Sequence, residues 1–376
     1  MGKKILYVVN DPGFFVSHRL PLAVAAQTAG YEVHVASPEG ASVGVLDSHG
    51  LCHHAVPLSR GGLNVVSELR LALALYRLFR KIKPDVVHLV TIKPVFYGGL
   101  AARLARVPGI IAAMSGLGFV FTGRGWRKAA LQLLVTSAYK TVFSQRNARV
   151  IFQNPDDLEL MLSAGAVGRE KCVIIRGSGV DLSEYGFVPE PDGVPVVLFA
   201  ARLLRDKGVV EFVRAATSLK HKGVAAHFVV AGMPDPHNPA SVTQEQVDAW
   251  AAEGHIEFVG YCRDMPELLK RTNLVVLPSY REGLPKVLIE AASCGRAVVT
   301  CDVPGCRHAI EDGRTGVLVP AGDDVALARA IEMLIDDPGL RRRMGLAGRE
   351  LAEREFSIHK VVAEHMELYS ELVRLT

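Results

Sequence analysis

The chain alternates short apolar runs with helix-forming or turn-forming stretches along its whole length. The runs are three to six residues long and rich in Val, Ile and Leu, which is typical of strands buried on both faces of a parallel sheet. They lie at 5–9, 32–36, 85–90, 110–113 and 149–152 in the first half, and at 195–200, 227–231, 256–260, 274–277, 297–301 and 317–319 in the second. Strands that alternate with helices predict parallel sheets with right-handed crossovers.

About eleven strands are too many for one doubly wound sheet of ordinary size. A segment rich in proline, glycine and acidic residues, 185–195, separates the two series of runs. The pattern therefore predicts an α/β chain with two Rossmann-like domains and a linker near 178–194. We expect a first domain over 1–180, a second over 190–355 and a C-terminal helix over 356–376 that packs back on the first domain. A single eight-repeat barrel is the competing topology, and the break in mid-chain argues against it.

Composition excludes several classes of protein. The 376 residues are 49% hydrophobic and 22% charged, which rules out disorder, collagen and coiled coil. The longest uncharged stretch, 107–123, contains a proline and four glycines and is shorter than a membrane-spanning helix requires. The first apolar run is too short for a signal peptide, and the six cysteines include no C-x-x-C pair. We therefore expect a cytoplasmic protein with reduced thiols.

Charge is distributed unevenly between the two halves. Residues 1–185 contain 21 Lys and Arg against 12 Asp and Glu, whereas the remainder contains 22 against 27. Two stretches of the basic half, 65–83 and 123–146, combine cations with aromatic and aliphatic residues at helical spacing. Such helices suit an anionic bilayer surface, where each cation is worth roughly 1 kcal/mol. The alternative is that both are core helices with solvated outer faces.

Several common ligand motifs are missing. The first strand–helix turn, 10–15, has one glycine where a dinucleotide fingerprint has three, and no P-loop pattern occurs. No D-x-D occurs either, which argues against metal-bridged diphosphate chemistry. The group His49, Cys52, His53 and His54 has metal-ligating side chains but no second half elsewhere, so a zinc site is the minor interpretation.

Cations follow one apolar run of the second half, and glycines and acids follow another. Arg202 and Lys207 come after 195–200, and the segment 278–286 comes after 274–277. Because ligands of open α/β sheets bind outside the carboxyl ends of the strands, we expect these segments to form one site. The planar fork of arginine and the point charge of lysine suit a diphosphate.

Two carboxylates accompany these cations. Glu282 precedes a predicted helix over 287–294, and Glu290 lies about one turn inside it, so both can face the same cleft. A carboxylate accepts two hydroxyl hydrogen bonds at once, which suits a ribose or a sugar ring. Gly283 lets backbone amides approach a ligand, and the helix N-terminus favours a phosphate. Each group alone could be a solvated surface charge, but their convergence predicts a ligand site.

Four motifs of the second half carry a family resemblance. They are Arg202…Lys207-Gly208, Gly260-Tyr261-Cys262-Arg263-Asp264, Glu282-Gly283-Leu284-Pro285…Glu290 and Asp302-Val303-Pro304-Gly305-Cys306-Arg307. They resemble the donor-site motifs of the retaining glycosyltransferases of family 4, in which two glutamates are separated by seven residues. The resemblance implies the GT-B fold, in which two Rossmann-like domains with parallel sheets face a cleft.

The resemblance also implies a role for each matching residue. Arg202 and Lys207 would hold the donor diphosphate, Glu290 the nucleotide ribose and Glu282 the transferred sugar. Arg202, Lys207 and Glu282 are therefore the expected catalytic residues. The remaining donor contacts implied are Gly13 at the diphosphate, Cys262 and Arg263 at the base, and Gly283, Leu284, Pro285 and Lys286 at the sugar. No metal and no other cofactor is implied.

Three segments of the first half, 10–19, 84–94 and 115–121, are similar to a subset of this family. The members of that subset extend undecaprenyl-diphosphate-linked sugars in bacteria, and the likeness favours transfer of N-acetylgalactosamine. Asp11, His18, His88 and Ser115 are the candidates for acceptor handling. Many family members carry a histidine near the end of the fifth strand, but 113–116 reads Ala-Met-Ser-Gly here, so one contact to the donor sugar stays unassigned.

The expected activity is retaining transfer of a hexose or N-acetylhexosamine from a UDP-sugar to a polyprenyl-diphosphate-linked sugar. The implied location is the cytoplasmic face of the inner membrane, with an anionic lipid surface and no nucleic acid among the partners. Two alternatives remain open at this point. One is a nucleotide-sugar 2-epimerase, and the other is a non-catalytic subunit that binds UDP-sugar in a membrane glycan complex.

Overall fold

Thirteen strands form two all-parallel sheets in the computed structural model, within the residues it describes, 2–58, 65–114, 126–236 and 238–374. The chain divides into two units. The first comprises Met1–Ser178 with His359–Thr376, and the second comprises Gly179–Ile358. The predicted α/β architecture of two parallel-sheet, Rossmann-like domains is confirmed.

The first unit contains a seven-stranded sheet in the order β3-β2-β1-β4-β5-β6-β7. Its strands are β1 (Lys4–Val8), β2 (Glu32–Ser37), β3 (Cys52–Ala55), β4 (Val86–Val90), β5 (Gly109–Met114), β6 (Ala148–Phe152) and β7 (Cys172–Ile174). Its helices are α1 (Pro12–Thr28), α2 (Val43–Ser48), α3 (Val65–Ile82), the π-helix η1 (Pro94–Gly98), α4 (Gly99–Ala105), α5 (Trp126–Phe143), α6 (Pro155–Ser163), the 3₁₀ turn η3 (Arg169–Lys171) and α13 (Ile358–Arg374).

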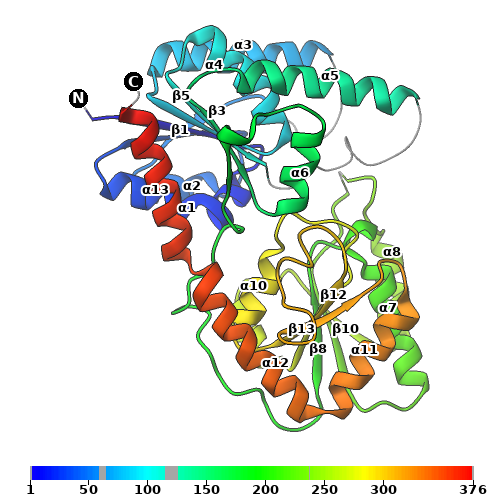
Figure 1. The fold of residues 1–376 in the computed structure, drawn as a ribbon. Helices are drawn as coiled ribbons and strands as arrows, with labels where there is room; N and C mark the ends of the chain where they lie inside the picture. The colour runs from blue at the N-terminus through cyan, green and yellow to red at the C-terminus, as the bar shows by residue number, and fades with distance from the viewer. Residues whose placement is uncertain (1, 59–64, 115–125, 237, 375–376) are drawn as a thin grey trace. The chain divides into compact units, whose positions relative to one another are not determined.

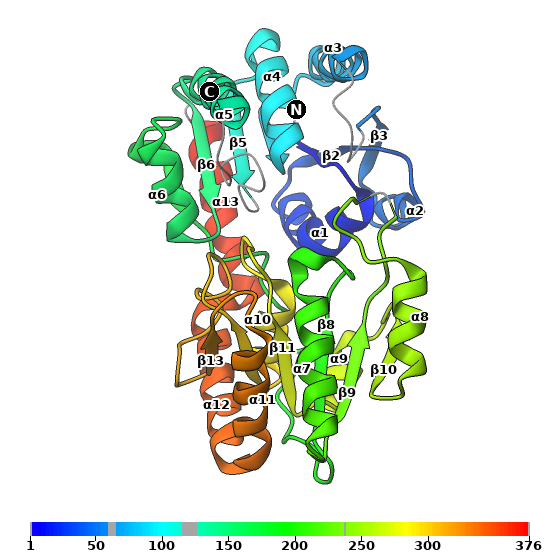
Figure 2. The same cartoon turned by 90° about the vertical axis from the view of Figure 1, so that its right-hand side faces the viewer.

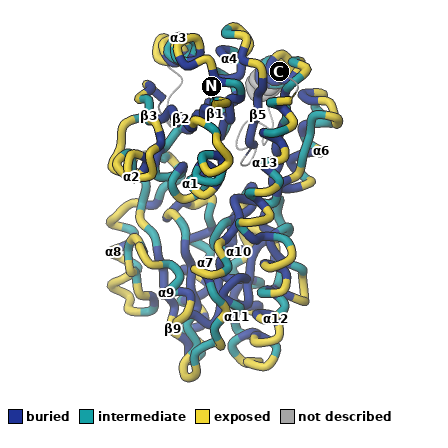
Figure 3. The backbone as a smooth tube through the Cα atoms, turned by 90° about the vertical axis from the view of Figure 1, so that its left-hand side faces the viewer, coloured by how far each residue is buried: buried dark blue, intermediate teal, exposed yellow. Residues whose placement is uncertain are grey.

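Helices cover both faces of this sheet (Figure 1). Alternate residues of each central strand point to opposite faces, so Leu6 and Val8 belong to one core cluster and Ile5 and Tyr7 to the other. The first cluster includes side chains of α3, α4, α5 and α6, and the second includes α1, α2 and α13. The central strands β4 and β5 are buried along their length, and β5 is dark blue in Figure 3, because both faces of the sheet are covered there.

The second unit contains a six-stranded sheet in the order β10-β9-β8-β11-β12-β13. Its strands are β8 (Val196–Ala200), β9 (His227–Ala231), β10 (Ile256–Gly260), β11 (Leu274–Leu277), β12 (Ala297–Cys301) and β13 (Gly316–Val319). Its helices are the 3₁₀ turn η4 (Arg205–Lys207), α7 (Val209–His221), α8 (Gln244–Ala252), α9 (Met265–Lys270), α10 (Lys286–Ser293), α11 (Asp324–Asp336), α12 (Pro338–Leu351) and the π-helix η5 (Ala352–Phe356). Helices α7 and α11 pack side by side (Figure 2), and α10 packs on α12.

Short polar side chains begin many of these helices where the sequence places them. Asp11, Asn154, Thr243 and Asp323 each accept a backbone N–H of the first turn of α1, α6, α8 and α11. Such caps satisfy donors that have no partner inside the helix and are worth about 1 kcal/mol each. Proline follows the cap in α1 and α6, where its missing N–H costs nothing.

Two strands of the first sheet escape the sequence prediction. Strand β3 lies at one edge and consists of Cys-His-His-Ala, so it lacks an apolar run, while β7 lies at the other edge and has only three residues. Edge strands need less apolar surface than central ones. Residues 179–195, which include most of the predicted linker, contain no helix or strand and are grouped with the second unit.

The possible zinc ligands form part of strand β3 and its neighbours instead of a cluster. His53 Nε2 lies 2.9 Å from the Ser37 hydroxyl, and His54 Nε2 lies 3.1 Å from His34 Nδ1. His49 Nδ1 bonds the Val45 carbonyl oxygen at 2.8 Å, at the end of α2. No three His, Cys, Asp or Glu side chains are arranged to hold a metal ion in the described part of the chain.

Helix α13 closes the second face of the first sheet over a buried polar cluster. The Tyr369 hydroxyl lies 2.8 Å from the Tyr7 hydroxyl and 2.7 Å from His88 Nδ1. The His365 ring stacks on the His88 ring with 5.7 Å between centroids, and its Nδ1 bonds the Val361 carbonyl oxygen. These side chains come from β1, β4 and α13, so the cluster ties the end of the chain to the centre of the sheet.

The cluster is poor in negative charge. Arg19 of α1 is 2% exposed and adds a buried cation. Burial, the His365 ring and Arg19 hold the pKa of His88 well below its usual range, and burial with Arg19 lowers the pKa of His365 to about 3. Burial likewise raises the pKa of Tyr7 and Tyr369 above the usual range. Both imidazoles are therefore neutral in the folded protein at neutral pH.

We expect the first unit to lose stability as the pH falls below about 6.5. There the unfolded chain binds protons on these imidazoles while the folded chain does not, down to the folded pKa of about 3 for His365. The free energy of unfolding should then fall by up to roughly 1.4 kcal/mol per pH unit for each such group. His365→Phe should flatten this slope in urea unfolding at pH 7, 6 and 5. Ala363→Ser, at an exposed position of the same helix, should keep the wild-type slope; equal slopes in the two variants would contradict this origin of the pH dependence.

Candidate active site

The second sheet reverses its strand order between β8 and β11, and open α/β sheets bind ligands at such a point. Residues 201–208 follow the carboxyl end of β8, and residues 278–285 follow that of β11. The structure brings these two segments into contact, as the sequence predicts. Lys207 and Glu282 form an ion pair in which both side chains are more than three-quarters buried.

Backbone contacts fix the two loops on each other. The carbonyl of Asp206 accepts hydrogen bonds from the Tyr280 amide at 3.0 Å and from the Ser279 hydroxyl at 3.0 Å. Gly208 follows with a φ of 76°, and a Cβ at this position would lie 2.1 Å from the Pro278 carbonyl oxygen. The left-handed backbone and the close approach of the second loop both require glycine here.

Glu282 is held from several directions. The Ser279 hydroxyl, whose one proton the Asp206 carbonyl and Glu282 share, lies 2.8 Å from Glu282 Oε1, the same oxygen that Lys207 contacts. The Glu282 amide donates to the Pro304 carbonyl in the loop after β12 at 3.1 Å. Gly305 approaches so closely that a Cβ there would lie 2.3 Å from the Glu282 carbonyl oxygen. This carboxylate is therefore preorganised, unlike a solvated surface acid.

Arg202 lies at the same strand end and is more accessible. Its Nη1 donates to Asp235 Oδ2 at 2.9 Å, and its side chain is 54% exposed. Asp235 follows β9, the neighbour of β8. Sequence reasoning did not single out Asp235 or Ser279, although both follow strands of this sheet, and their place after a strand end was the available signal. Arg202 is therefore paired with Asp235, just as Lys207 is paired with Glu282.

Glu290 lies inside α10 and is 6% exposed. Lys286 Nζ lies 3.1 Å from Glu290 Oε1, one helical turn away. Burial and the Glu290 carboxylate, which also hydrogen-bonds the Tyr185 hydroxyl, raise the pKa of Tyr185 above its usual range. The Lys286 side chain therefore binds Glu290, a contact that the family resemblance did not imply.

The other donor contacts implied by the motifs occupy loops at the same edge of the sheet. Gly283, Leu284 and Pro285 are buried and lead into α10, which begins without a side-chain cap. Cys262 and Arg263 follow β10, where Arg263 is exposed and Cys262 packs partly against the core of this unit. The edge thus carries three cation–carboxylate pairs, Arg202–Asp235, Lys207–Glu282 and Lys286–Glu290, and the positive end of a helix dipole.

In the first unit, the loop after β1 presents mostly backbone. The Asp11 carboxylate accepts the Phe14 amide at 2.6 Å and caps α1. A Cβ on Gly13 would lie 3.1 Å from Asp11 Oδ1 and 3.4 Å from the Ser42 hydroxyl. Asp11 therefore has a structural role, and Gly13 lies in the first turn of α1 beside it.

Of the other acceptor candidates, His18 and His88 lie in different surroundings. His18 stacks on Phe14 with 4.1 Å between ring centroids, and its Nδ1 lies 2.6 Å from the Ser17 hydroxyl. His88 has no exposed surface and lies in the cluster beneath α13, so direct contact between His88 and an acceptor is not supported. Ser115 lies outside the described residues.

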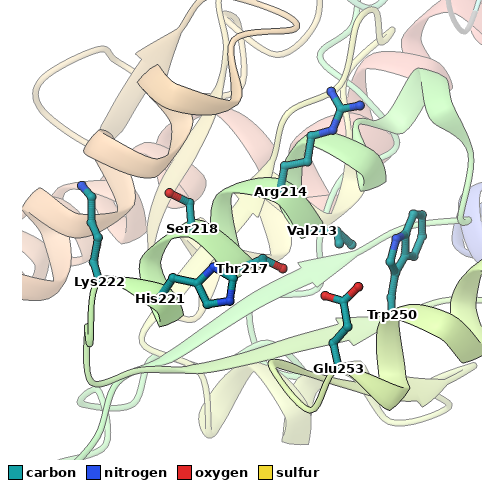
Figure 4. A pocket seen from close by; sticks show the side chains of 8 residues that line it. All are labelled: Val213, Arg214, Thr217, Ser218, His221, Lys222, Trp250 and Glu253. Carbon is teal, nitrogen blue, oxygen red and sulfur yellow. The ribbon is translucent and has the colours of Figure 1, made fainter.

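A groove between α7 and α8 carries cations and an indole but lies elsewhere in the second unit. Arg214, His221 and Lys222 of α7 and the following turn line it together with Trp250 and Glu253 (Figure 4). In a crossover connection the helix runs antiparallel to the strands, so the last turn of α7 lies near the amino ends of the strands. This groove is therefore not part of the ligand-binding edge.

Two parallel-sheet, Rossmann-like units are the architecture of the GT-B fold, and sequence comparison identifies the family. Residues 4–154 match the family "Glycosyl transferase 4-like", and residues 186–351 match "Glycosyl transferases group 1". The chain belongs to the GT4-type glycosyltransferases, which confirms the family expected from the motifs.

Individual relatives agree with this assignment. The chain is 28% identical over 380 residues to the N,N'-diacetylbacillosaminyl-diphospho-undecaprenol alpha-1,3-N-acetylgalactosaminyltransferase of Campylobacter jejuni, covering 97% of this chain and 98% of that protein. It is 25% identical over 331 residues to the UDP-Gal:alpha-D-GlcNAc-diphosphoundecaprenol alpha-1,3-galactosyltransferase of Escherichia coli, covering 85% and 83%. The structure of sucrose-phosphate synthase from Thermosynechococcus elongatus matches with a TM-score of 0.80 at 21% identity over 100% of both chains, which supports the fold.

Gly208→Ala should destabilise the second unit much more than Gly223→Ala. Both glycines have positive φ, but a Cβ at Gly223 meets nothing within 4 Å, whereas at Gly208 it meets the Pro278 carbonyl. We expect a loss of about 1–2 kcal/mol at Gly223 from backbone strain alone, and about 2–3 kcal/mol beyond that at Gly208. Urea unfolding followed by Trp250 fluorescence measures both. Equal losses would show that the close contact between the loops is not required.

Proposed function

We propose that this protein catalyses retaining transfer of a sugar from a UDP-sugar to a sugar linked to a polyprenyl diphosphate. The observation that carries the proposal is the convergence of Arg202, Lys207 and Glu282 with the N-terminus of α10 on the switch point of the second sheet. The UDP-sugar donor named for the Escherichia coli relative and the undecaprenyl-diphosphate-linked sugar acceptor named for both bacterial relatives support the two substrate classes.

The chemistry of donor activation follows from these charges. A UDP leaving group gains negative charge as the glycosidic bond breaks. Arg202 and Lys207 would take up that charge, exchanging their carboxylate partners Asp235 and Glu282 for phosphate oxygens. Such preorganised cations need no metal to bridge the diphosphate. The departing phosphate oxygen can accept the proton of the acceptor hydroxyl on the same face of the sugar, so no separate general base is required.

The remaining contacts keep the assignments that the motifs imply. Glu290 would bind the ribose hydroxyls, Glu282 and the amides of 283–286 the transferred sugar, and the turn at 262–263 the base. Gly13 would approach the diphosphate from the first unit. The sugar that we propose is an N-acetylhexosamine such as N-acetylgalactosamine, or a related hexose, because the relatives transfer these two kinds of sugar.

Helix α3 supports our further proposal that the protein binds peripherally at an anionic membrane surface. Its buried stripe comprises Leu71, Leu75 and Phe79, while Leu69 and Leu73 on another face are 70% and 45% exposed. Arg70, Arg77, Arg80 and Lys81 lie on the same helix. Exposed leucines among cations are typical of a helix that enters a headgroup layer. We propose that these leucines and cations bind the cytoplasmic face of the membrane. In the described part of the chain, no helix has the length and hydropathy to cross a bilayer.

The side chains at the start of α5, the second basic segment, lie outside the described residues.

Two alternative functions remain distinguishable by turnover. A nucleotide-sugar 2-epimerase would change the donor without an acceptor, and a non-catalytic subunit would bind UDP-sugar without changing it. Membership of the GT4-type transferases favours the transferase over both alternatives.

Acceptor-dependent UDP release is the test of the proposed reaction. Purified protein is incubated in EDTA with a panel of UDP-sugars, with and without undecaprenyl-diphosphate-linked sugars. We expect UDP release that requires both substrates and is selective for one donor. Arg202→Ala should reduce kcat/KM by about 100- to 1000-fold, because one preorganised contact to the developing charge is lost. Glu290→Ala should mainly raise the donor KM.

The controls distinguish the three functions. Epimerised donor without transfer would establish the epimerase, and UDP-sugar binding without turnover would establish the binding subunit. A product whose anomeric configuration is inverted would overturn the retaining mechanism. Arg343→Ala, at an exposed arginine of α12, should leave every rate unchanged.

The membrane proposal predicts that Leu69→Asn with Leu73→Asn reduces flotation with anionic liposomes by at least about tenfold. The two changes remove exposed apolar surface and leave every cation in place. Leu346→Asn, at a leucine of α12 that is 52% exposed, should float like the wild type. Equal binding to neutral liposomes would contradict the electrostatic part, and unchanged flotation of the double variant would contradict the part played by the leucines.

A further inference from the structure

The residue after β4 has an unusual backbone. Thr91 has a φ of 75°, in the left-handed region that β-branched residues avoid. Its hydroxyl is buried and has no hydrogen-bond partner among the described residues. The π-helix η1 (Pro94–Gly98) follows three residues later, and π-helical turns occur often at functional sites. Strained backbone of this kind is costly and is typical of ligand sites.

A buried ion pair lies beside this strained residue. Lys93 Nζ is 2.7 Å from Glu68 Oε1, with side-chain exposures of 19% and 9%. The Tyr97 hydroxyl also bonds Glu68, and burial with this carboxylate raises the pKa of Tyr97. Glu68 thus receives two contacts and holds Lys93 in place. An ammonium carries three N–H donors, so a lysine can hold a carboxylate and a phosphate oxygen together.

The pair occupies the ligand-binding edge of the first sheet. This sheet reverses its strand order between β1 and β4, so its switch point lies between residues 10–13 after β1 and residues 91–93 after β4. Glu68 connects this edge to α3, where it is buried while its neighbour Leu69 is exposed. One helix therefore contributes both a leucine to the proposed lipid-facing surface and the carboxylate that holds Lys93.

We infer that Lys93 binds the diphosphate of the lipid-linked acceptor, with Glu68 as the positioning residue and the Thr91 hydroxyl as a second donor. This inference rests on the proposed function. A lipid-linked diphosphate lies in the headgroup layer, where the lipid chain ends. Glu68 is the sequence neighbour of the exposed Leu69 on α3, so its pair with Lys93 adjoins the helix that we place in the headgroup layer. The buried Thr91 hydroxyl, which has no partner among the described residues, is a second donor after the same strand as Lys93.

The diphosphate is the part of the acceptor that this site distinguishes. A diphosphate offers acceptor oxygens to both Lys93 and the Thr91 hydroxyl, whereas a monophosphate has fewer acceptor oxygens to share between them. A hydrogen bond to a charged group contributes about 1.5–3 kcal/mol, which corresponds to about 10- to 100-fold in binding. The site therefore selects the linkage between lipid and sugar, and leaves the choice of donor to the second unit.

The test compares two soluble acceptors that carry the same sugar and the same short isoprenyl chain. One is joined by a diphosphate and the other by a monophosphate. The wild type should prefer the diphosphate acceptor through a lower KM. Lys93→Met should raise the KM for the diphosphate acceptor by about 10- to 100-fold and bring the two acceptors within about threefold. The donor KM and the slow hydrolysis of UDP-sugar without acceptor should stay unchanged.

Three further variants separate binding from folding. Lys93→Arg should recover most of the diphosphate preference, and Glu68→Gln should raise the acceptor KM with little change in kcat. Lys140→Met, at an exposed lysine of α5, should behave as the wild type. Thermal unfolding of each variant, with UDP binding by calorimetry, checks that both units are intact.

Each outcome decides one question. If a folded Lys93→Met enzyme keeps the wild-type preference for the diphosphate, the inference is wrong and the proposed function stands. If the donor KM rises along with the acceptor KM, Lys93 serves the donor and the inference is also wrong. If the wild type transfers sugar to neither acceptor while it binds UDP, the proposed function fails and the inference fails with it.

Discussion

The contact between the loop after β8 and the loop after β11 is the constraint on which the active site depends. The backbone of Asp206 accepts two hydrogen bonds from the second loop, and Gly208 allows the loops to approach within van der Waals distance. Lys207 therefore meets Glu282 although 75 positions separate them in the chain. A cation and a carboxylate placed in this way neutralise each other until an anionic ligand displaces the carboxylate from the cation.

The common direction of the strands in a parallel sheet also determines where the polar residues of the first unit lie. All its strands end at one edge, and the turn after β4 brings Thr91 and Lys93 to that edge. A second polar group of the first unit lies on a face of the sheet and not at its edge. Beneath α13, a polar cluster that includes Tyr7 and Tyr369 is closed off from solvent. A buried cluster of this kind fixes the place of the last helix, because any other placement would leave its polar groups without partners.

Much of the fold could be predicted because central strands of a parallel sheet are buried on both faces. The runs 227–231, 256–260, 274–277 and 297–301 coincide with β9 to β12 as observed. The edge strands β3 and β7 could not be predicted in this way, since they bury less surface and carry no continuous apolar run. The prediction that His88 handles the acceptor is not supported for a similar reason. The residues next to His88 in the sequence give no sign that α13 covers it.

The sequence by itself determined the fold class, the family and the residue types at the donor site, because strand periodicity and motif spacing are local properties of the chain. The tertiary structure decided the partners: Asp235 for Arg202, Lys286 for Glu290 and Glu68 for Lys93. Most such pairs join loops and helices that are distant in sequence. Their formation depends on how strands and helices pack, and this information is absent from any single segment of the chain.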